Sequence, residues 1–394
     1  MVPPATMDEI AAKVKAALTS TPYSCDELIP LAGGNANYVF RGHLSNPLPP
    51  DNTHQVLIKH GEPFVRTNES FSLPLTRCNV ENVALHEIQT SPKATSPSPP
   101  WCTVRTPKQH HFDRETHTQV QEYLPTGIDL KNYALKYYEP HTNPSKKPQC
   151  LALGHSLGIW LKTFHDWTAV WAAKERFPST ARSRPSIHTI AFQNKILQML
   201  KHKTYYDSLL KLVDTFPAIL PQARQVFEQV KSMADQELAD DSTLQAVHGD
   251  FWTGNILIPD KEMDCEAPPE PTTVFVVDWE VISLGVPVRD VGQMIAELYM
   301  LKLFKDIDAG EWIIEGFVEG YGPLGGEDKV FRTLVHIGCH LVVVGGTVDG
   351  WGERGDVEGV VGFGRDMIVK GWEGNRKWFE GRVLGGLFGG GRGE

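Results

Sequence analysis

The chain has 394 residues, of which 41% are hydrophobic and 22% are charged, and its formal net charge is -10. These proportions are typical of a globular protein that is long enough for two domains. The negative charge argues against the basic surface that nucleic-acid binding requires. The apolar runs are too short to cross a bilayer, so no membrane segment is predicted.

Six cysteines are scattered along the chain without a Cys-x-x-Cys pair. This spacing indicates neither a zinc site nor a disulfide framework, and it is typical of a reducing compartment. The N-terminus lacks a basic segment followed by an apolar run, so no secretory signal is predicted. We therefore expect a cytoplasmic location.

The first predicted helix begins at a capping box formed by Thr6 and Glu9. A glycine-rich connection follows, with the sequence Ala-Gly-Gly-Asn-Ala-Asn-Tyr-Val-Phe at 32–40. Small residues there would let backbone N–H groups approach phosphate oxygens. Taken alone, Gly-Gly-Asn favours an ordinary hairpin turn instead. The candidate nucleotide-binding residues of this connection are Gly33, Gly34, Asn35 and Asn37.

Residues 55–59 form a predicted strand that ends in Lys59, and the next predicted helix carries Glu81 and Glu87. A lysine at a strand end is common, so only its place in the series of motifs distinguishes Lys59. Glu81 lies at helical spacing from three apolar residues that would face the core. We therefore prefer Glu81 over Glu87 as the partner of Lys59.

An alternating strand at 118–124 is followed by Pro-Thr-Gly, and beyond it the hydrophobic pattern becomes helical. We place a boundary between two domains there, at 1–124 and 125–384. The glycine-rich residues 385–394 are expected to form a flexible tail.

In the helical part, apolar residues at helical spacing predict a helix that ends at His165. Aromatic and histidine side chains in such a stripe belong more often to a core than to a site. We therefore assign no chemistry to His165, Trp160 or Trp167.

The stretch from His248 to Glu280 carries the groups best suited to phosphoryl transfer. Two apolar segments flank an acidic insert at 260–273, which predicts a strand, a long connection and a second strand. Asp250 precedes Asn255 by five residues, the spacing of a kinase catalytic loop with its base and metal ligand. Asp278 ends the second strand, in the place of the other metal-binding residue. The insert is interpreted as solvated, with contact to a cationic substrate as the alternative.

The His-Gly-Asp-x-x-x-x-Asn segment that begins at His248, followed by an apolar strand ending in Asp-x-Glu, resembles the aminoglycoside phosphotransferase and choline kinase-like superfamily. The glycine-rich connection is similar to that of methylthioribose kinase-like members. Asp290 fits a family carboxylate that braces the catalytic loop. Val286 replaces an aspartate of the family pattern, which affects only the local polar network.

The resemblance implies a bilobal, protein-kinase-like α+β fold. The small N-terminal lobe would hold an antiparallel sheet, and the larger C-terminal lobe would be mainly helical. The implied activity is the ATP- and Mg²⁺-dependent phosphorylation of a hydroxyl on a small molecule. Lys59, held by Glu81, would bridge the α- and β-phosphates, and the backbone of Glu122 and Leu124 would contact adenine.

In the same resemblance Asp250 is the base, and His248 orients its loop. Asn255 and Asp278 would bind magnesium. A catalytically inactive nucleotide-binding module is the first alternative, and it would be favoured by loss of these residues or of Lys59, which are all present. A protein kinase is the second alternative, and the lack of an Ala-Pro-Glu segment after Asp278 argues against it.

Overall fold

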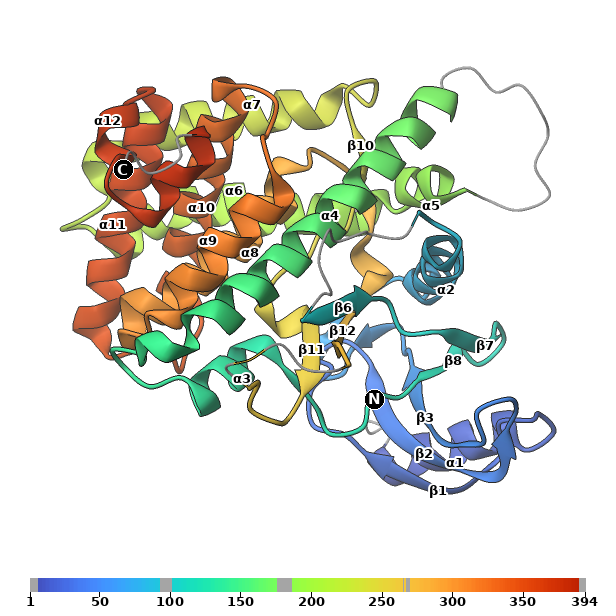
Figure 1. Ribbon diagram of the computed structural model, residues 1–394. Helices are drawn as coiled ribbons and strands as arrows, with labels where there is room; N and C mark the ends of the chain where they lie inside the picture. Colours follow the sequence, from blue (N-terminus) through green and yellow to red (C-terminus); the bar gives the residue numbers. More distant parts are fainter. Residues whose placement is uncertain (1–5, 93–100, 176–185, 265, 267–269, 390–394) are drawn as a thin grey trace. The chain divides into compact units, whose positions relative to one another are not determined.

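A computed structural model of the chain describes residues 6–92, 101–175, 186–264, 266 and 270–389. The chain divides into two compact units, whose elements are labelled in Figure 1. The first unit consists of Met1–Thr90, Thr106–Pro125 and Asp278–Val281. The second consists of Ser91–Arg105, Thr126–Val277 and Ile282–Glu394.

The first unit is built on an antiparallel sheet. Its elements are α1 (Met7–Leu18), β1 (Cys25–Pro30), β2 (Tyr38–Leu48), β3 (Thr53–His60), β4 (Phe64–Val65), β5 (Asn68–Ser72), α2 (Thr76–Gln89), β7 (Gln109–Asp113), β8 (Thr118–Glu122) and η4 (Trp279–Val281). Five strands form the sheet in the order β1-β2-β3-β8-β7, and β4 pairs with β5 as a separate hairpin. A glycine-rich connection, a strand with a lysine and a helix with a glutamate follow one another, as in kinases.

Helix α1 begins where the sequence predicts. The Thr6 side chain accepts a hydrogen bond from Glu9 N (3.2 Å), and the Glu9 carboxylate accepts one from Thr6 N (2.7 Å). The apolar face of the helix buries Ile10, Val14 and Leu18 in the core of the unit. The capping box thus fixes the helix start at the edge of this core.

The second unit is larger and mainly helical. Its first elements are β6 (Cys102–Arg105), β9 (Gly127–Asp129), α3 (Leu130–Tyr137), η1 (Pro144–Lys146), α4 (Lys147–Glu175), α5 (Ile187–Gln193), α6 (Lys195–Thr215), η2 (Pro221–Ala223), α7 (Arg224–Ala239) and β10 (Gln245–Val247). They are followed by η3 (Thr253–Asn255), β11 (Ile256–Pro259), β12 (Thr272–Val276), β13 (Ser283–Gly285), α8 (Val288–Lys305), α9 (Ala309–Tyr321), α10 (Glu327–Thr347), α11 (Arg354–Trp372), α12 (Arg376–Phe379) and η5 (Val383–Phe388). The predicted α+β class, with an antiparallel sheet followed by a mainly helical part, is confirmed.

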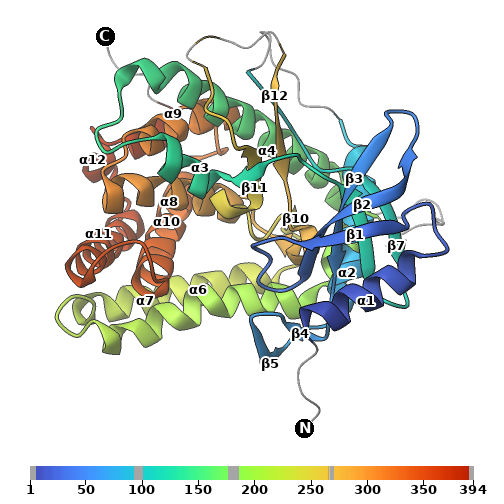
Figure 2. The same ribbon diagram turned by 90° about the horizontal axis from the view of Figure 1, so that it is seen from below.

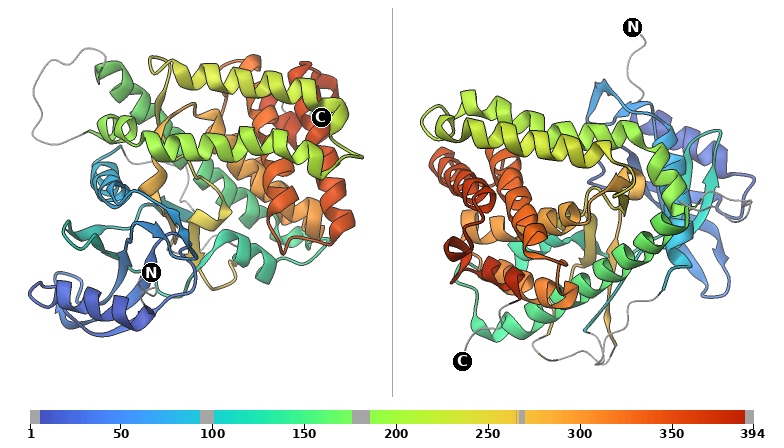
Figure 3. Two further views of the ribbon diagram at one scale, coloured as in Figure 1. Left: turned by 180° about the vertical axis from the view of Figure 1, so that it is seen from behind. Right: turned by 90° about the horizontal axis from the view of Figure 1, so that it is seen from above.

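The helices of the second unit share a core. Figure 2 shows α6 and α7 side by side, and Figure 3 shows the C-terminal helices in orange and red. Buried side chains of α6, α7, α10 and α11 form one hydrophobic cluster, with Tyr206, Phe227, Val335 and Val361 among its members. Helix α10 is long and apolar enough to cross a membrane, but 78% of its most apolar window is buried in the protein. It is therefore packed like the core helix of a globular protein.

Two short sheets of the second unit flank the loop that carries His248 and Asp250. Strands β11 and β12 pair antiparallel with Ile256 opposite Val276, as the strand–connection–strand prediction requires. They belong to a sheet with the order β6-β12-β11-β9, and β10 pairs with β13. The loop between β10 and β11 is thereby anchored at both of its ends.

Three details differ from the predictions. Strand β6, predicted in the first domain, pairs in parallel with β12 and so belongs to the second unit. Helix α4 does not end at His165 but continues to Glu175, because residues 166–175 contain no glycine or proline that would stop it. Residues 385–388 lie in η5, where Leu387 is buried, and only 390–394 of the predicted tail fall outside the described residues.

Candidate functional site

Lys59 lies in a buried ion cluster of the first unit. Its Nζ is 2.9 Å from Oε2 of Glu81 on α2 and 2.5 Å from Oδ1 of Asp278. The side chains of Lys59 and Glu81 are almost fully buried, whereas that of Asp278 is 41% exposed. The structure therefore brings Lys59 together with the glutamate preferred from the sequence, and also with the exposed carboxylate of Asp278.

Three carboxyl groups and two cations meet in this cluster. Burial opposes the charged form of Lys59, but Asp278, Glu81 and Glu280 outweigh burial and hold its pKa well above the usual value. Arg77 Nε lies 3.3 Å from Glu280 Oε2, which makes it the second cation of the cluster. Burial raises the pKa of the Glu81 carboxyl, so the exposed carboxylate of Asp278 is the group of the cluster best placed to meet a further cation.

Asn37 is buried and joins the same cluster. Its Nδ2 donates to Glu280 Oε2 (2.8 Å), and its Oδ1 accepts from Arg77 Nη2 (3.1 Å). The side-chain amide is thus bonded to the protein at both ends. Asn37 therefore links the glycine-rich connection to Glu280 and Arg77, and its nucleotide contact stays a prediction.

The β4–β5 hairpin holds the glycine-rich connection through backbone oxygens. Arg66 Nε donates to the carbonyl oxygen of Gly34 (2.8 Å), and Nη2 donates to that of Gly33 (3.2 Å). Thr67 N donates to Asn35 O (3.2 Å). Gly33 and Gly34 adopt φ values of +100° and +68°, which favour glycine. The carbonyls of the connection are therefore tied to the hairpin by Arg66, a residue that the sequence did not single out.

The predicted adenine-contacting residues lie at the end of β8. The N–H of Glu122 donates to Lys108 O (2.8 Å), and its Oε2 accepts from Lys108 N (3.0 Å). Leu124 follows two residues later, beyond the strand. Glu122 also lines a groove of about 770 Å³ in the first unit, and Lys59 is not among the residues lining it. The groove is therefore a feature separate from the ion cluster.

In the second unit, the catalytic loop is held by Asp290 of α8. This buried carboxylate accepts hydrogen bonds from the backbone N–H groups of His248 (2.8 Å) and Gly249 (3.0 Å) and from His165 Nε2 (3.0 Å). Burial opposes its ionisation, but the bond from His165 outweighs burial and holds the pKa of Asp290 below its usual range. His165, to which the sequence assigned no role, therefore braces the loop, and its Nδ1 lies 2.9 Å from Tyr321 Oη.

His248 is fully buried, and both of its ring nitrogens are engaged. Nε2 lies 2.9 Å from the carbonyl oxygen of Val277, which can only accept, so Nε2 carries the proton. Nδ1 accepts a hydrogen bond from Asp250 N (3.2 Å). With one nitrogen donating and the other accepting within the protein, His248 orients the loop as a neutral ring.

Asp250 presents a carboxylate that is charged and partly exposed. Its Oδ1 accepts from Lys201 Nζ (2.6 Å) and Gln293 Nε2 (2.9 Å), and its side chain is 18% exposed. Burial opposes ionisation, but the Lys201 ammonium outweighs burial and holds the pKa of this carboxyl below its usual range. Lys201 and Gln293 come from α6 and α8, and neither was predicted as a site residue.

Asn255 is turned toward Asp250. Its Nδ2 donates to the Asp250 carbonyl oxygen (2.9 Å) and lies 3.4 Å from Oδ2. The amide oxygen of Asn255 is therefore the atom that could serve as a metal ligand. Within the described ranges, no three His, Cys, Asp or Glu side chains gather into a metal site. Magnesium usually binds through one or two protein groups and substrate phosphates. The amide oxygen of Asn255 therefore fits a magnesium ion that is carried by a nucleotide.

Acidic residues of the insert form ion pairs with lysines of the same unit. Lys136 Nζ donates to Asp260 Oδ1 (2.7 Å), and Lys146 Nζ lies 2.6 Å from Glu262 Oε1. Glu262 remains 49% exposed, in keeping with a solvated insert. Cys265 and residues 267–269 lie outside the described residues.

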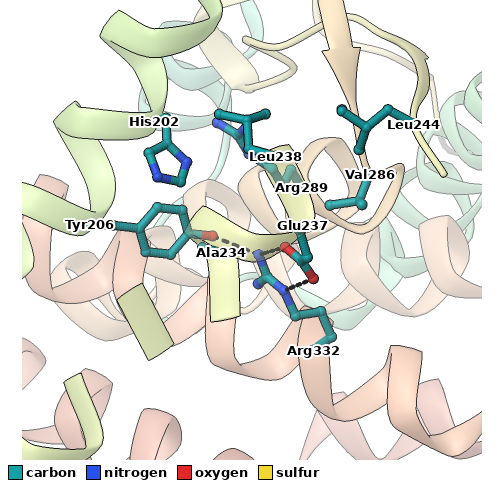
Figure 4. Close-up of a pocket in the computed structure, with 10 residues that line it drawn as sticks. His202, Tyr206, Ala234, Glu237, Leu238, Leu244, Val286, Arg289 and Arg332 are labelled. Atoms are coloured by element: carbon teal, nitrogen blue, oxygen red, sulfur yellow. Dashed lines mark hydrogen bonds and ion pairs between the residues drawn. The ribbon is translucent and has the colours of Figure 1, made fainter. Parts of the chain in front are cut away.

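Val286, which stands in the place of a family aspartate, lines a cavity too small for an acceptor. Figure 4 shows Arg332 in this cavity, bonded to Glu237 and to the hydroxyl of Tyr206. Arg332 Nε donates to Glu237 Oε1 (2.7 Å), and Nη2 donates to Tyr206 Oη (2.8 Å). The cavity volume of about 10 Å³ has room for roughly one water molecule.

Comparison with protein families gives one match to more than half of the chain. The model of the phosphotransferase enzyme family matches residues 104–330. The phosphotransferase FrzJ of Cladobotryum sp is 29% identical over 393 residues, which cover 97% of each chain. The 4-hydroxytryptamine kinase of Psilocybe cyanescens is 21% identical over 318 residues, which cover 79% of each chain.

Solved structures with related names are also similar. A choline/ethanolamine kinase family protein from Mesorhizobium loti gives a TM-score of 0.45 at 15% identity, over 94% of this chain and 100% of that one. ADP-bound aminoglycoside phosphotransferase APH(2'')-Ib gives a TM-score of 0.45 at 14% identity, over 91% of this chain and 99% of that one. The resemblance inferred from the catalytic stretch is confirmed by the family match.

Proposed function

Because the chain belongs to the phosphotransferase enzyme family, we propose that it transfers the γ-phosphoryl group of ATP, with magnesium, to a hydroxyl of a small molecule. The observation that carries this proposal is the state of Asp250. Asp290 fixes the loop of Asp250, and the Lys201 ammonium favours the ionised form of its carboxylate. The side chain is still partly exposed to solvent. An ionised carboxylate in this setting suits a base that orients an attacking hydroxyl.

In this proposal Asp250 accepts a hydrogen bond from the acceptor hydroxyl and takes its proton as the new P–O bond forms. Phosphoryl transfer depends mainly on positioning and charge neutralisation, so a carboxylate with a low pKa is adequate. His248 and Asp290 contribute indirectly, by fixing the backbone from His248 to Asp250. Their hydrogen bonds leave Asp250 with little freedom to turn away.

On the nucleotide side, we propose that Lys59 contacts the α- and β-phosphates while Glu81 holds its ammonium in place. The glycine-rich connection would offer its backbone N–H groups to the phosphates. Asn255 and Asp278 would hold magnesium, which when bound neutralises phosphate charge. The exposed carboxylate of Asp278 supports a cation there. The proposed adenine contact by the backbone of Glu122 and Leu124 completes the set.

For the acceptor, we propose a small organic alcohol or phenol. The support comes from the relatives that span most of this chain, of which one is named a phosphotransferase and another a kinase of 4-hydroxytryptamine. We further propose a reducing, cytoplasmic location. The five cysteines within the described residues are all free thiols, which supports it.

The proposal is tested by incubating the purified chain with MgATP and a panel of amino alcohols, hydroxyindoles, sugars and aminoglycosides. ADP release and mass spectrometry of each acceptor are measured together. We expect at least one acceptor to gain a phosphate in a reaction that requires both magnesium and Asp250. If the chain does not bind MgATP and no acceptor of the panel gains a phosphate, the proposal is contradicted.

A further inference from the structure

Lys201 of α6 is bound directly to the proposed base, although no feature of the catalytic loop itself requires a lysine there. Its Nζ lies 2.6 Å from Asp250 Oδ1, and its side chain is 25% exposed. Both residues belong to the second unit. The two side chains of the pair, 25% and 18% exposed, are therefore both accessible to solvent.

The two oxygens of Asp250 have unequal partners. Oδ1 accepts both Lys201 Nζ (2.6 Å) and Gln293 Nε2 (2.9 Å). Among the residues that the structure describes, Oδ2 has one long contact, 3.4 Å from Asn255 Nδ2. Because a general base must lie about 2.6–3.2 Å from the hydroxyl that it serves, the oxygen with capacity to accept another hydrogen bond is the better candidate. That oxygen is Oδ2.

The ion pair contributes more to the state of the base than to the fold. Partly exposed ion pairs contribute little to the free energy of unfolding. A cation within hydrogen-bond distance nevertheless favours the ionised carboxylate and lowers the pKa of the carboxyl group. The direction of the Asp250 pKa agrees with this geometry.

We propose that Lys201 is a positioning residue for phosphoryl transfer: it fixes Asp250 through Oδ1 and leaves Oδ2 to receive the acceptor hydroxyl. This inference rests on the proposed function. In the reaction the acceptor oxygen bonds to the γ-phosphorus, and the bond from that phosphorus to the β–γ bridging oxygen breaks. The hydroxyl proton passes to Oδ2, and ADP leaves with the electrons of the broken bond.

The test uses the full chain with MgATP alone, so that water is the phosphoryl acceptor and no other acceptor need be known. The kcat and the KM for MgATP of ATP hydrolysis are measured at neutral pH for the parent, Lys201→Met, Lys201→Arg and Lys203→Met. Lys203 is an exposed lysine two residues along the same helix, which makes it the matched control. A second readout is the thermal shift with MgATP, which reports nucleotide binding without turnover.

We expect the kcat of Lys201→Met to fall about tenfold, while its KM for MgATP and its thermal shift stay near those of the parent, because the base is displaced but the nucleotide still binds. Lys201→Arg should restore kcat, and Lys203→Met should match the parent. A kcat of Lys201→Met equal to that of the parent would overturn the inference and leave the proposed function standing. No hydrolysis by the parent would count against the proposed function, on which the inference rests.

Discussion

At the scale of single residues, Asp278 combines a strained backbone with an exposed charge. Its φ of +62° lies in the left-handed region, which aspartate tolerates better than most residues other than glycine. The Lys59 ammonium holds one of its oxygens at 2.5 Å. Backbone strain at a charged residue is often found at functional sites. We interpret it here as the cost of presenting a carboxylate in a fixed direction beside Lys59.

The Lys59–Glu81 pair gives a prediction at the same scale. Lys59→Met and Glu81→Gln should each reduce the stabilisation by MgATP, because each removes one side of a buried ion pair. The double variant should be no worse than the poorer single variant, with a coupling energy of about 1–3 kcal/mol. The measurement is the thermal shift with and without millimolar MgATP.

Glu87→Gln, on the same helix, is the control for this cycle and should behave like the parent. Losses that simply add would show that Glu81 does not act through Lys59.

At the scale of elements, helices α4 and α9 approach each other through glycines. A Cβ at Gly154, Gly158, Gly316 or Gly320 would lie between 2.0 and 2.3 Å from a backbone oxygen of the facing helix. The backbones therefore meet closely, as in other small-xxx-small helix pairs. This contact places His165 of α4 beside Tyr321 of α9, the pair that extends the support of Asp290. Helix packing here determines the position of the His165 side chain that contacts Asp290.

Gly158→Ala should accordingly destabilise the second unit by about 1–3 kcal/mol or more, because the facing backbone cannot yield to the methyl group. Gly359→Ala is a matched change in α11, where an added Cβ would meet nothing within 4 Å. It should be neutral or stabilise by about 0.5–1 kcal/mol, since alanine is the better helix former. The free energy of unfolding of both variants is measured in urea. Equal changes in this free energy would disprove the close contact.

The local elements around Asp250 were predictable from the sequence, but the supports of its side chain were not. Strands β11 and β12 were predictable because each is an apolar run beside the insert, and such a run is visible in consecutive residues. Lys201 and Gln293 lie 49 and 43 residues from Asp250, and His165 lies 125 residues from Asp290. Such pairings depend on how helices pack, which hydrophobic periodicity does not specify.

At the scale of the whole molecule, buried histidines tie stability to pH. Burial, reinforced by Arg332, Arg289 and His340, holds the pKa of His336 well below its usual value. A folded-state pKa below the unfolded value means that the unfolded chain binds more protons in acid. The contribution of His336 is therefore present above about pH 6.5 and is lost as the pH falls below it. Burial also lowers the pKa of His60 and His202.

We therefore expect the melting temperature to fall between pH 7 and pH 5. His336→Gln should reduce this fall, because glutamine does not titrate. The measurement is differential scanning calorimetry of both proteins in buffers of equal ionic strength. If the melting temperature falls equally in parent and variant, His336 does not contribute to the pH dependence of stability.

The central claim is that Asp250 performs the chemistry while Asp278 helps to hold the metal and nucleotide. The most direct measurement compares Asp250→Asn and Asp278→Asn for turnover and for the thermal shift with MgATP. Asp250→Asn should lose turnover by orders of magnitude but keep a thermal shift near that of the parent. The stabilisation behind this shift is about 2.7 kcal/mol when the MgATP concentration is a hundred times Kd. Asp278→Asn should lose both, because it removes a charged oxygen from a hard cation. A lost shift in Asp250→Asn with an intact shift in Asp278→Asn would contradict the assignment.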